Sequence, residues 1–309
     1  MRKIVITPRG FARYGEEELR ILREGGFTVD YNNTGKAYTV EEFYSHCAEA
    51  EGLIVGVEKV DRDFIDACPR LKAVVKFGIG TDNIDIPYCR EKGIYVGRCA
   101  GTNSRSVAEM ALTYILAETK NLYQSFFETK NGGWNKATGC EVMGKTLGII
   151  GFGAVGKHLA KMAKGLEMRV LIYDVLPIDP DLAKEYGAEI ADLETIYKTA
   201  DFTSLHVPLT EETRDMISLK EMRMMKRSCV LINTSRGGIV SEKDLYLALS
   251  EKIIRAAYFD VFSSEPPAPD EPLLRLDNFY LTPHTASRAA EAEKRTCQVS
   301  ARLILEALG

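Results

Sequence analysis

The sequence predicts an α/β protein made of two successive domains, each built around a parallel sheet. The chain has 309 residues, which exceeds the usual size of a single domain. Short apolar runs alternate with helix-length segments along most of the chain, as expected for parallel sheets covered by helices on both faces. This alternation is interrupted once, between about residues 104 and 145, and then begins again.

The first series of strands and helices covers about the first hundred residues. Strands are expected at Lys3–Thr7, Phe27–Tyr31, Leu53–Val55 and Leu71–Lys76. Helices are expected between them, at Glu16–Glu24, Thr39–Ala50 and Asp61–Cys68. Thr39 and Glu42 have the spacing of a capping box, which marks the start of the second helix.

The second series begins at Lys145 and follows one long helix, expected over Ser104–Gln124, and a glycine-rich loop at Asn131–Asn135. Its strands are expected at Thr146–Ile150, Arg169–Tyr173, Phe202–Val207, Cys229–Thr234, Ala256–Val261 and Phe279–Leu281. A last helix, about Ala289–Leu308, comes after this series is complete and could return to the first domain.

Composition excludes several classes of partner. The net charge is -4 and no basic run is present, which argues against nucleic acid and anionic membranes as partners. No apolar stretch reaches the ~20 residues that span a bilayer, and the N-terminus lacks the features of a signal peptide. The seven cysteines are an odd number without paired metal spacing, so we expect free thiols, no metal and a cytoplasmic location.

A dinucleotide site is expected at Gly151-Phe152-Gly153-Ala154-Val155-Gly156, directly after a strand and at the start of a helix. The first glycine permits a tight turn, the second lets the backbone approach a diphosphate, and the third lets the helix pack on the sheet. Asp174 ends the next strand, where an acid binds ribose hydroxyls and repels a 2′-phosphate. The motif predicts a Rossmann domain that binds NAD; a glycine turn with a helix-capping Asp is the alternative.

Three polar residues follow three strand ends of the same domain. Oxidation of an alcohol needs a base for the hydroxyl proton and, for a hydroxy acid, a cation for the carboxylate. Of the four histidines, His284 suits the base best, because it ends the last strand and imidazole titrates near neutrality. Glu265 is expected to fix its tautomer, and Arg236 has the planar fork that matches a carboxylate. Each has an ordinary structural interpretation alone, but the combination indicates catalysis.

The order of motifs resembles the D-isomer-specific 2-hydroxyacid dehydrogenases, particularly the phosphoglycerate dehydrogenase-like branch. The resemblance covers essentially the whole chain. Its carriers are Gly78-Ile79-Gly80-Thr81-Asp82-Asn83-Ile84-Asp85, Asn103 to Glu109, Gly151–Gly156, His206-Val207-Pro208-Leu209-Thr210, Asn233 to Gly238, Asp260 to Glu265, and Pro283-His284.

The resemblance implies roles for particular residues. Arg236 would hold the substrate carboxylate and carbonyl oxygen, His284 would exchange the proton, and Glu265 would hold and polarise His284. Backbone amides of the substrate domain would bind the carboxylate from the other side, at Gly78, Ile79 and Gly80. The remaining cofactor contacts would come from His206, Val207 and Pro208 at the adenine side and from Thr234, Asp260 and Ala286 at the nicotinamide end, with Arg236 and His284 also beside the cofactor.

The resemblance also implies a domain arrangement. Residues 1–101 and 286–309 would form a discontinuous, flavodoxin-like substrate domain, and residues 102–285 the inserted NAD-binding domain. Such enzymes commonly pair as homodimers through the cofactor domain, and the helix from Ser104 and the loop with Trp134 would form the dimer arm. A Trp134 packed within its own subunit is the alternative. No C-terminal regulatory domain of the kind found in some phosphoglycerate dehydrogenases is expected.

Departures from the family pattern leave the substrate open. Phosphoglycerate dehydrogenases carry an Arg after the third strand, whereas this chain has Glu58 in that run. Lys76, Arg9 and Arg105 are the remaining cations that could meet a phosphate. The expected substrate is a small D-2-hydroxy or 2-keto acid, with 3-phosphoglycerate as one possibility and unphosphorylated hydroxypyruvate or glyoxylate as the alternative. A non-enzymatic NAD-sensing protein and a formate or phosphite dehydrogenase are more remote interpretations.

Overall fold

The computed structural model describes residues 2–309, which divide into two compact units. One unit holds the chain up to Asn103 together with Arg288–Gly309, and the other holds Ser104–Ser287. The boundaries expected from the sequence are after residues 101 and 285. Both units contain helices and a wholly parallel sheet, so the predicted fold class is confirmed.

The discontinuous unit carries a five-stranded sheet. Its strands are β1 (Lys3–Ile6), β2 (Thr28–Tyr31), β3 (Gly52–Val55), β4 (Ala73–Lys76) and β5 (Tyr95–Arg98). Its helices are α1 (Arg9–Tyr14), α2 (Glu16–Glu24), α3 (Val40–Cys47), α4 (Arg62–Ala67), α5 (Ile86–Glu91) and α13 (Ala290–Leu308). The strand order β2-β1-β3-β4-β5 is that of flavodoxin-like sheets.

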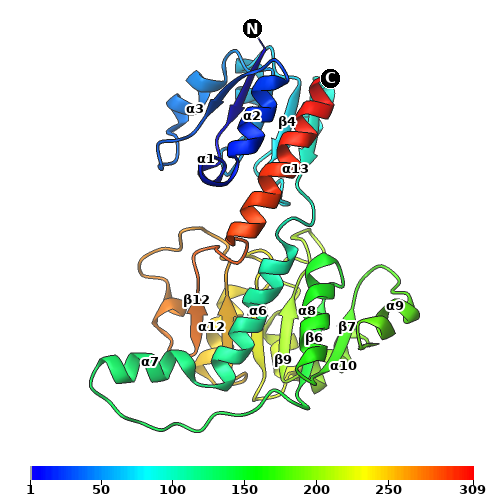
Figure 1. The fold of residues 1–309 in the computed structure, drawn as a ribbon. Coiled ribbons are helices and arrows are strands. Elements are labelled where there is room, and N and C mark those ends of the chain that lie inside the picture. The colour runs from blue at the N-terminus through cyan, green and yellow to red at the C-terminus, as the bar shows by residue number, and fades with distance from the viewer. Residues whose placement is uncertain (1) are drawn as a thin grey trace. The chain divides into compact units, whose positions relative to one another are not determined.

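Alternating side chains of this sheet serve two separate cores. Ile4 and Ile6 face one core and Val5 faces the other, as the period of a strand requires. The first core is completed by α13, whose residues Ala301 and Ile304 are buried against the sheet. Figure 1 shows α13, the last element of the chain, beside strands from the first hundred residues. The C-terminal helix therefore completes the hydrophobic core on one face of the sheet that the N-terminal strands form.

The continuous unit carries a seven-stranded sheet. Its strands are β6 (Thr146–Ile150), β7 (Arg169–Tyr173), β8 (Ala188–Ile190), β9 (Phe202–Leu205), β10 (Val230–Asn233), β11 (Ala256–Phe259) and β12 (Phe279–Leu281). Its helices are α6 (Ser104–Thr119), α7 (Leu122–Lys130), α8 (Ala154–Gly165), α9 (Pro180–Glu185), α10 (Leu193–Thr199), α11 (Leu219–Met224) and α12 (Glu242–Ser250), with a 3-10 turn η1 (Pro272–Arg275).

The strand order of this sheet reverses at the β6–β9 pair. The order is β12-β11-β10-β9-β6-β7-β8, so the chain first runs outward from β6 to β8 and then returns to the other side of β6 with β9. This is the doubly wound order of dinucleotide-binding domains, which bind ligands where the order reverses, at the carboxyl ends of the strands. On one face of the sheet, α6 and α8 lie side by side (Figure 1) and share a core with β6.

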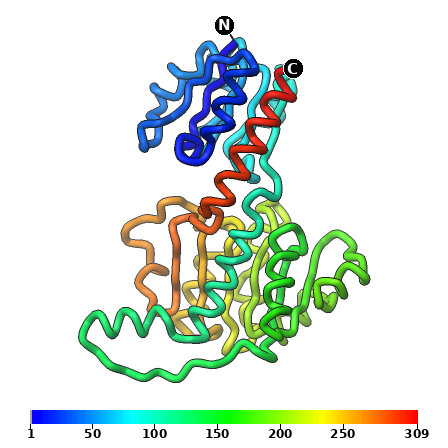
Figure 2. Tube along the Cα trace, in the orientation of Figure 1, coloured from blue at the N-terminus to red at the C-terminus, as the bar shows by residue number. Residues whose placement is uncertain are grey.

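The expectation of one long helix over Ser104–Gln124 is wrong. The structure has two helices, because Asn121 adopts a left-handed conformation with φ of 48° and ends the hydrogen-bonding pattern of α6. Asn tolerates this conformation better than most residues. After α7 the trace continues as an extended loop back to β6 (Figure 2). The apolar spacing continues across the break, which is why the sequence pattern did not reveal it.

Two strands were missed by the sequence analysis, and both lie at sheet edges. β5 contains a glycine and exposes Tyr95 and Arg98, while β8 is three residues long with Ala188 as its buried residue. Neither has the continuous apolar run that marks a strand buried on both faces.

None of the helices among residues 2–309 is both long and apolar enough to cross a lipid bilayer.

We expect Ile304→Ala to destabilise the discontinuous unit by about 2–5 kcal/mol, the cost of removing a buried aliphatic side chain. Ile304 is fully buried on α13, and its side chain would lie 3.1 Å from a Cβ placed on Gly52 of β3. Arg302→Ala, on the exposed side of the same helix, is the control and should change stability little. Urea unfolding followed by circular dichroism measures both, and equal effects would contradict the proposed role of α13.

Candidate active site

The glycine loop after β6 is shaped by close backbone approaches. Gly151 has φ of 99°, and a Cβ there would lie 2.4 Å from the backbone oxygen of His206. A Cβ on Gly156 would lie 2.2 Å from the backbone oxygen of Gly151. Gly153 differs, because no atom lies within 4 Å of the position of its Cβ. Two glycines therefore pack the loop against its own domain, and the third leaves space for a ligand.

The start of α8 offers hydrogen-bond donors beside that space. Gly153 is the N-cap residue and supplies no side-chain cap. Gly153 and Ala154 are exposed, and Val155 is half-buried. The first amides of a helix lack acceptors within it and carry the positive end of the helix dipole, an arrangement that binds phosphate groups. The loop therefore has the shape and the donors for the diphosphate of a dinucleotide.

Asp174 lies directly after β7, next to the glycine loop. Its carboxylate accepts hydrogen bonds from the amide of Phe152, at 2.7 Å, and from the amide of Leu176, at 3.0 Å. A carboxylate has about four acceptor positions, so two remain for hydroxyl groups. The same carboxylate that fixes the glycine loop can thus receive the ribose hydroxyls of an adenosine.

Two buried polar atoms at the carboxyl edge of this sheet lack hydrogen-bond partners. They are Nδ1 of His206, after β9, and Oγ1 of Thr234, after β10, and they belong to a set of four such atoms among residues 2–309. Val207 and Pro208 continue the segment after His206 and are at least partly exposed. Buried polar atoms are nearly always satisfied in proteins. These atoms therefore fit a ligand that supplies the missing partners, as NAD would.

The His206 imidazole is neutral at physiological pH. Burial lowers the pKa of His206 to about 4, and its Nε2 lies 2.9 Å from the hydroxyl of Ser204. An imidazole whose pKa is this low does not take up a proton reversibly near pH 7. His206 is therefore suited to a polar contact with a ligand and not to acid–base catalysis.

His284 and Glu265 form a hydrogen-bonded pair. Nδ1 of His284 lies 2.7 Å from Oε2 of Glu265, and the other oxygen of Glu265 accepts from the amide of Phe262 at 3.0 Å. Both side chains are partly exposed, at 47% and 39%, which leaves Nε2 of His284 open to a ligand. The carboxylate holds the proton on Nδ1 and stabilises the imidazolium once Nε2 takes a second proton.

The backbone of His284 is held in an unusual conformation by Asp260. His284 has φ of 52°, which is uncommon for a residue with a side chain. Its amide donates to the backbone oxygen of Asp260 at 2.9 Å. The Asp260 carboxylate, 1% exposed, also accepts from the hydroxyl of Thr282 at 2.5 Å and from the amides of Thr285 and Ala286, each at 2.8 Å. One buried carboxylate thus fixes the segment on both sides of His284.

Tyr114 extends this hydrogen-bond network into α6. Its hydroxyl lies 2.5 Å from that of Thr282, and because Thr282 donates to Asp260, Tyr114 acts as the donor. Burial raises the pKa of Tyr114 to about 12, so the hydroxyl keeps its proton. The sequence analysis assigned no role to Tyr114 or Thr282. No sequence signal marks a contact between residues so far apart in the chain.

Arg236 lies in a tight turn after β10. Oδ1 of Asn233 accepts from the amide and hydroxyl of Ser235, at 3.0 and 2.8 Å, and its amide nitrogen donates to the backbone oxygen of Arg236 at 2.8 Å. A Cβ on Gly237 would lie 2.1 Å from the carbonyl carbon of Phe262. The turn that carries Arg236 is therefore pressed against the segment that leads to Glu265. Asn233 is a positioning residue that the sequence analysis did not identify as such.

These groups share one edge of one sheet. β10, β11 and β12 are consecutive neighbours, and Arg236, Glu265 and His284 follow their respective carboxyl ends. Gly78, Ile79 and Gly80 lie in the other unit, after β4, where Gly78 has φ of 144° and its carbonyl accepts from the amide of Cys99 at 2.8 Å. Their expected contact with a substrate carboxylate stays a prediction.

Comparison with known proteins identifies the family. Residues 112–286 match the model of the D-isomer specific 2-hydroxyacid dehydrogenase, NAD binding domain. The chain belongs to this family, and this segment is its NAD-binding domain.

Relatives of this family carry different activity names. The chain is 39% identical to a D-3-phosphoglycerate dehydrogenase of Methanocaldococcus jannaschii over 297 residues. That match covers 95% of this chain and 56% of the relative. It is also 40% identical to a hydroxypyruvate reductase of Thermotoga maritima over 260 residues. That match covers 82% of this chain and 84% of the relative. The chain thus spans little more than half of the first relative.

A solved structure supports the same family. The crystal structure of the D-lactate dehydrogenase from Aquifex aeolicus, complexed with NAD and lactic acid, superposes with a TM-score of 0.82. It is 29% identical and covers 98% of this chain and 94% of that one. The fold and the NAD-binding domain are therefore those of the 2-hydroxyacid dehydrogenases.

We expect Gly151→Ala to weaken NADH binding by at least about tenfold, because the new Cβ would clash with the backbone of His206 and strain a left-handed turn. Titration of NADH fluorescence measures the affinity. Gly165→Ala is the matched control: Gly165 ends α8, and no atom lies within 4 Å of its Cβ position. NADH affinity unchanged in Gly151→Ala would contradict the role assigned to the glycine loop.

Proposed function

We propose that this protein catalyses reversible hydride transfer between NAD and the α-carbon of a small D-2-hydroxy acid. The hydrogen bond of 2.7 Å between His284 and Glu265 carries the proposal, because it orients an imidazole within the NAD-binding domain. NAD supplies the hydride acceptor, or NADH the donor, when bound. The proton and the substrate carboxylate must be handled by side chains of the protein.

The proposed proton acceptor is Nε2 of His284. In the oxidising direction the hydroxyl proton moves to Nε2, the α-carbon loses its hydride, and the carbon–oxygen bond becomes a carbonyl. Glu265 keeps Nδ1 protonated, so Nε2 carries the lone pair that accepts this proton. In the reducing direction the imidazolium returns the proton to the oxygen of the keto acid. Arg236 binds the carboxylate and the reacting oxygen through its planar guanidinium.

The cofactor contacts proposed from the geometry follow the sheet edge. Gly151, Gly153 and the first turn of α8, including Ala154 and Val155, would hold the diphosphate, with Gly156 packing the helix. Asp174 would bind the adenosine ribose, and His206, Val207 and Pro208 would border the adenine. Thr234 would bind toward the nicotinamide end. Ala286 and Asp260 would lie at the same end, although the Asp260 carboxylate also has the positioning role described above.

The proposed substrate is a D-2-hydroxy acid, and the proposal does not specify the substituent on its α-carbon. The run after β3 carries Glu58, whose carboxylate accepts from the hydroxyl of Thr7 at 2.5 Å and from the amide of Gly56 at 3.1 Å. Lys76 donates to the backbone oxygen of Gly56 and to Asn83, and Arg105 is paired with Glu109 at 2.8 Å. A phosphorylated acid and an unphosphorylated one such as hydroxypyruvate are both consistent with the names of the relatives.

A homodimer through the cofactor domain is also proposed, supported by α7 and the loop that follows it. None of the nine residues of α7 is buried, yet Tyr123, Phe126 and Phe127 are apolar and 59–61% exposed. Trp134, in the loop, is 80% exposed. A helix this short is marginal in water without packing, and an apolar surface of this kind indicates an interface. A second copy of the chain is the occupant that we propose.

A reducing compartment such as the cytoplasm fits the thiols. All seven cysteines are free, and six are buried. Burial raises the pKa of Cys229 to about 12, so this thiol stays protonated and unreactive.

We expect His284→Ala to lower kcat by roughly 10²–10⁴-fold, the range of a general acid–base group, with NADH binding retained. The measurement is the loss of NADH absorbance with glyoxylate, hydroxypyruvate, pyruvate, 2-oxoglutarate and 3-phosphohydroxypyruvate offered separately. His158→Ala, at an exposed position of α8, is the control and should behave like the wild type. Equal activity of His284→Ala and the wild type would reject the mechanism. No turnover of any acid by a protein that binds NADH would instead favour a non-enzymatic function.

We expect Phe126→Glu to dissociate the dimer, because a charge on an apolar interface loses its hydration when the copies associate. Light scattering coupled to size-exclusion chromatography measures the mass. Val40→Glu, on the exposed start of α3, adds the same charge elsewhere and should leave the mass unchanged. A monomeric wild type, or a dimeric Phe126→Glu protein, would argue against this interface.

A further inference from the structure

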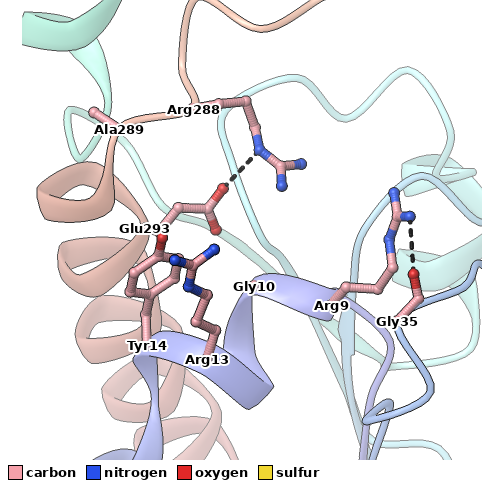
Figure 3. Close-up of a pocket in the computed structure, with 8 residues that line it drawn as sticks. All are labelled: Arg9, Gly10, Arg13, Tyr14, Gly35, Arg288, Ala289 and Glu293. Carbon is pink, nitrogen blue, oxygen red and sulfur yellow. Dashed lines mark hydrogen bonds and ion pairs between the residues drawn. The ribbon is translucent and has the colours of Figure 1, made fainter.

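A cavity of 440 Å³ lies within the discontinuous unit, and none of the residues of the candidate active site lines it. It is bordered by α1, by Gly35 in the loop after β2, and by the start of α13. Its volume falls in the range of small-molecule sites. Figure 3 shows three arginines around it, Arg9, Arg13 and Arg288, together with the carboxylate of Glu293.

The arginines are only partly neutralised by the protein. Nε of Arg288 lies 3.0 Å from Oε1 of Glu293. Within residues 2–309, neither Arg9 nor Arg13 has a carboxylate at ion-pair distance; Arg9 makes a long hydrogen bond of 3.4 Å to the backbone oxygen of Gly35, and the guanidinium of Arg13 lies 5.3 Å from the ring centre of Tyr14. Three guanidinium groups and one carboxylate leave a formal charge of +2 at the cavity.

The position of Arg9 and Arg13 makes this arrangement unfavourable without an anion. The two residues are four apart on α1, so their charges lie on the same face of the helix and repel each other. Arg9 also begins the helix, where a positive charge opposes the helix dipole. An anion between the guanidinium groups would remove both costs and use the planar donors of arginine.

Glu293 is a buried residue that lines the cavity. It is 9% exposed, and a Cβ on Gly10 would lie 2.1 Å from its Oε2. The absence of a side chain at Gly10 therefore admits this carboxylate against α1. Burial raises the pKa of Glu293, which Arg288 partly counteracts. Glu293 offsets part of the positive charge at the cavity and holds Arg288 at its border.

We propose that Arg9, Arg13 and Arg288 form a binding site for a doubly charged oxyanion, such as a phosphate group. The charge of the anion matches the formal excess at the cavity, and each guanidinium offers paired donors to its oxygens. The group could be carried by the substrate or be free in solution. The site itself does not depend on the proposed hydride transfer.

The test is calorimetric titration of the full-length protein with inorganic phosphate at fixed ionic strength. We expect Arg13→Gln to weaken binding at least tenfold and Glu293→Gln to strengthen it about threefold, because the second change removes the competing carboxylate. Arg20→Gln is the matched control. Arg20 belongs to the same unit but is paired with Glu17 and Glu24, so its loss should leave phosphate binding unchanged.

Opposite effects of Arg13→Gln and Glu293→Gln support the site, since misfolding would weaken binding in both. Phosphate binding that is undetectable in the wild type, or equal in Arg13→Gln and Arg20→Gln, overturns it. A rise in KM of Arg13→Gln for 3-phosphohydroxypyruvate but not for hydroxypyruvate assigns the phosphate to the substrate. Unchanged KM values with weakened phosphate binding assign it to a free anion. Binding is measured without NADH, so failure of the proposed hydride transfer leaves this result interpretable.

Discussion

The buried carboxylate of Asp260 is the interaction on which the proposed catalytic geometry depends. A charged group that is 1% exposed is tolerated because Thr282, Thr285 and Ala286 donate to it. These bonds hold the segment that contains His284, whose own backbone is in a left-handed conformation. Removing the Asp260 carboxylate would leave several buried donors unpaired, which would destabilise the folded protein. The same change would release the segment that positions the His284 imidazole.

The parallel sheet supplies the rest of the arrangement. Since all strands of the NAD-binding unit run the same way, their carboxyl ends meet at one edge, and residues far apart in the chain become neighbours there. The reversal of strand order at β6 and β9 brings the glycine loop against His206. Arg236, Glu265 and His284 follow three adjacent strands. The positions of the proposed cofactor-binding and catalytic groups therefore follow from the topology of the sheet.

The two units use their charges differently. In the NAD-binding unit, Asp174 and Asp260 accept hydrogen bonds from backbone amides that also shape the loops they lie in. In the discontinuous unit, the arginines around Glu293 exceed the acids near them. The first arrangement stabilises the folded loops without a ligand. The second leaves positive charge at a cavity, which is why an oxyanion is the ligand that we propose for it.

The sequence by itself determined the two parallel-sheet domains, the glycine loop with Asp174, and the strand ends that carry Arg236, Glu265 and His284. These features depend on local patterns of apolar residues, glycines and polar residues at strand ends, which are visible in one dimension. The tertiary structure alone decided the break at Asn121, the edge strands β5 and β8, and the network from Tyr114 through Thr282 to Asp260. It also decided that Arg13 and Arg288, distant in the sequence, border one cavity. Each of these depends on a backbone conformation or a long-range contact, and neither leaves a periodic signal in the chain.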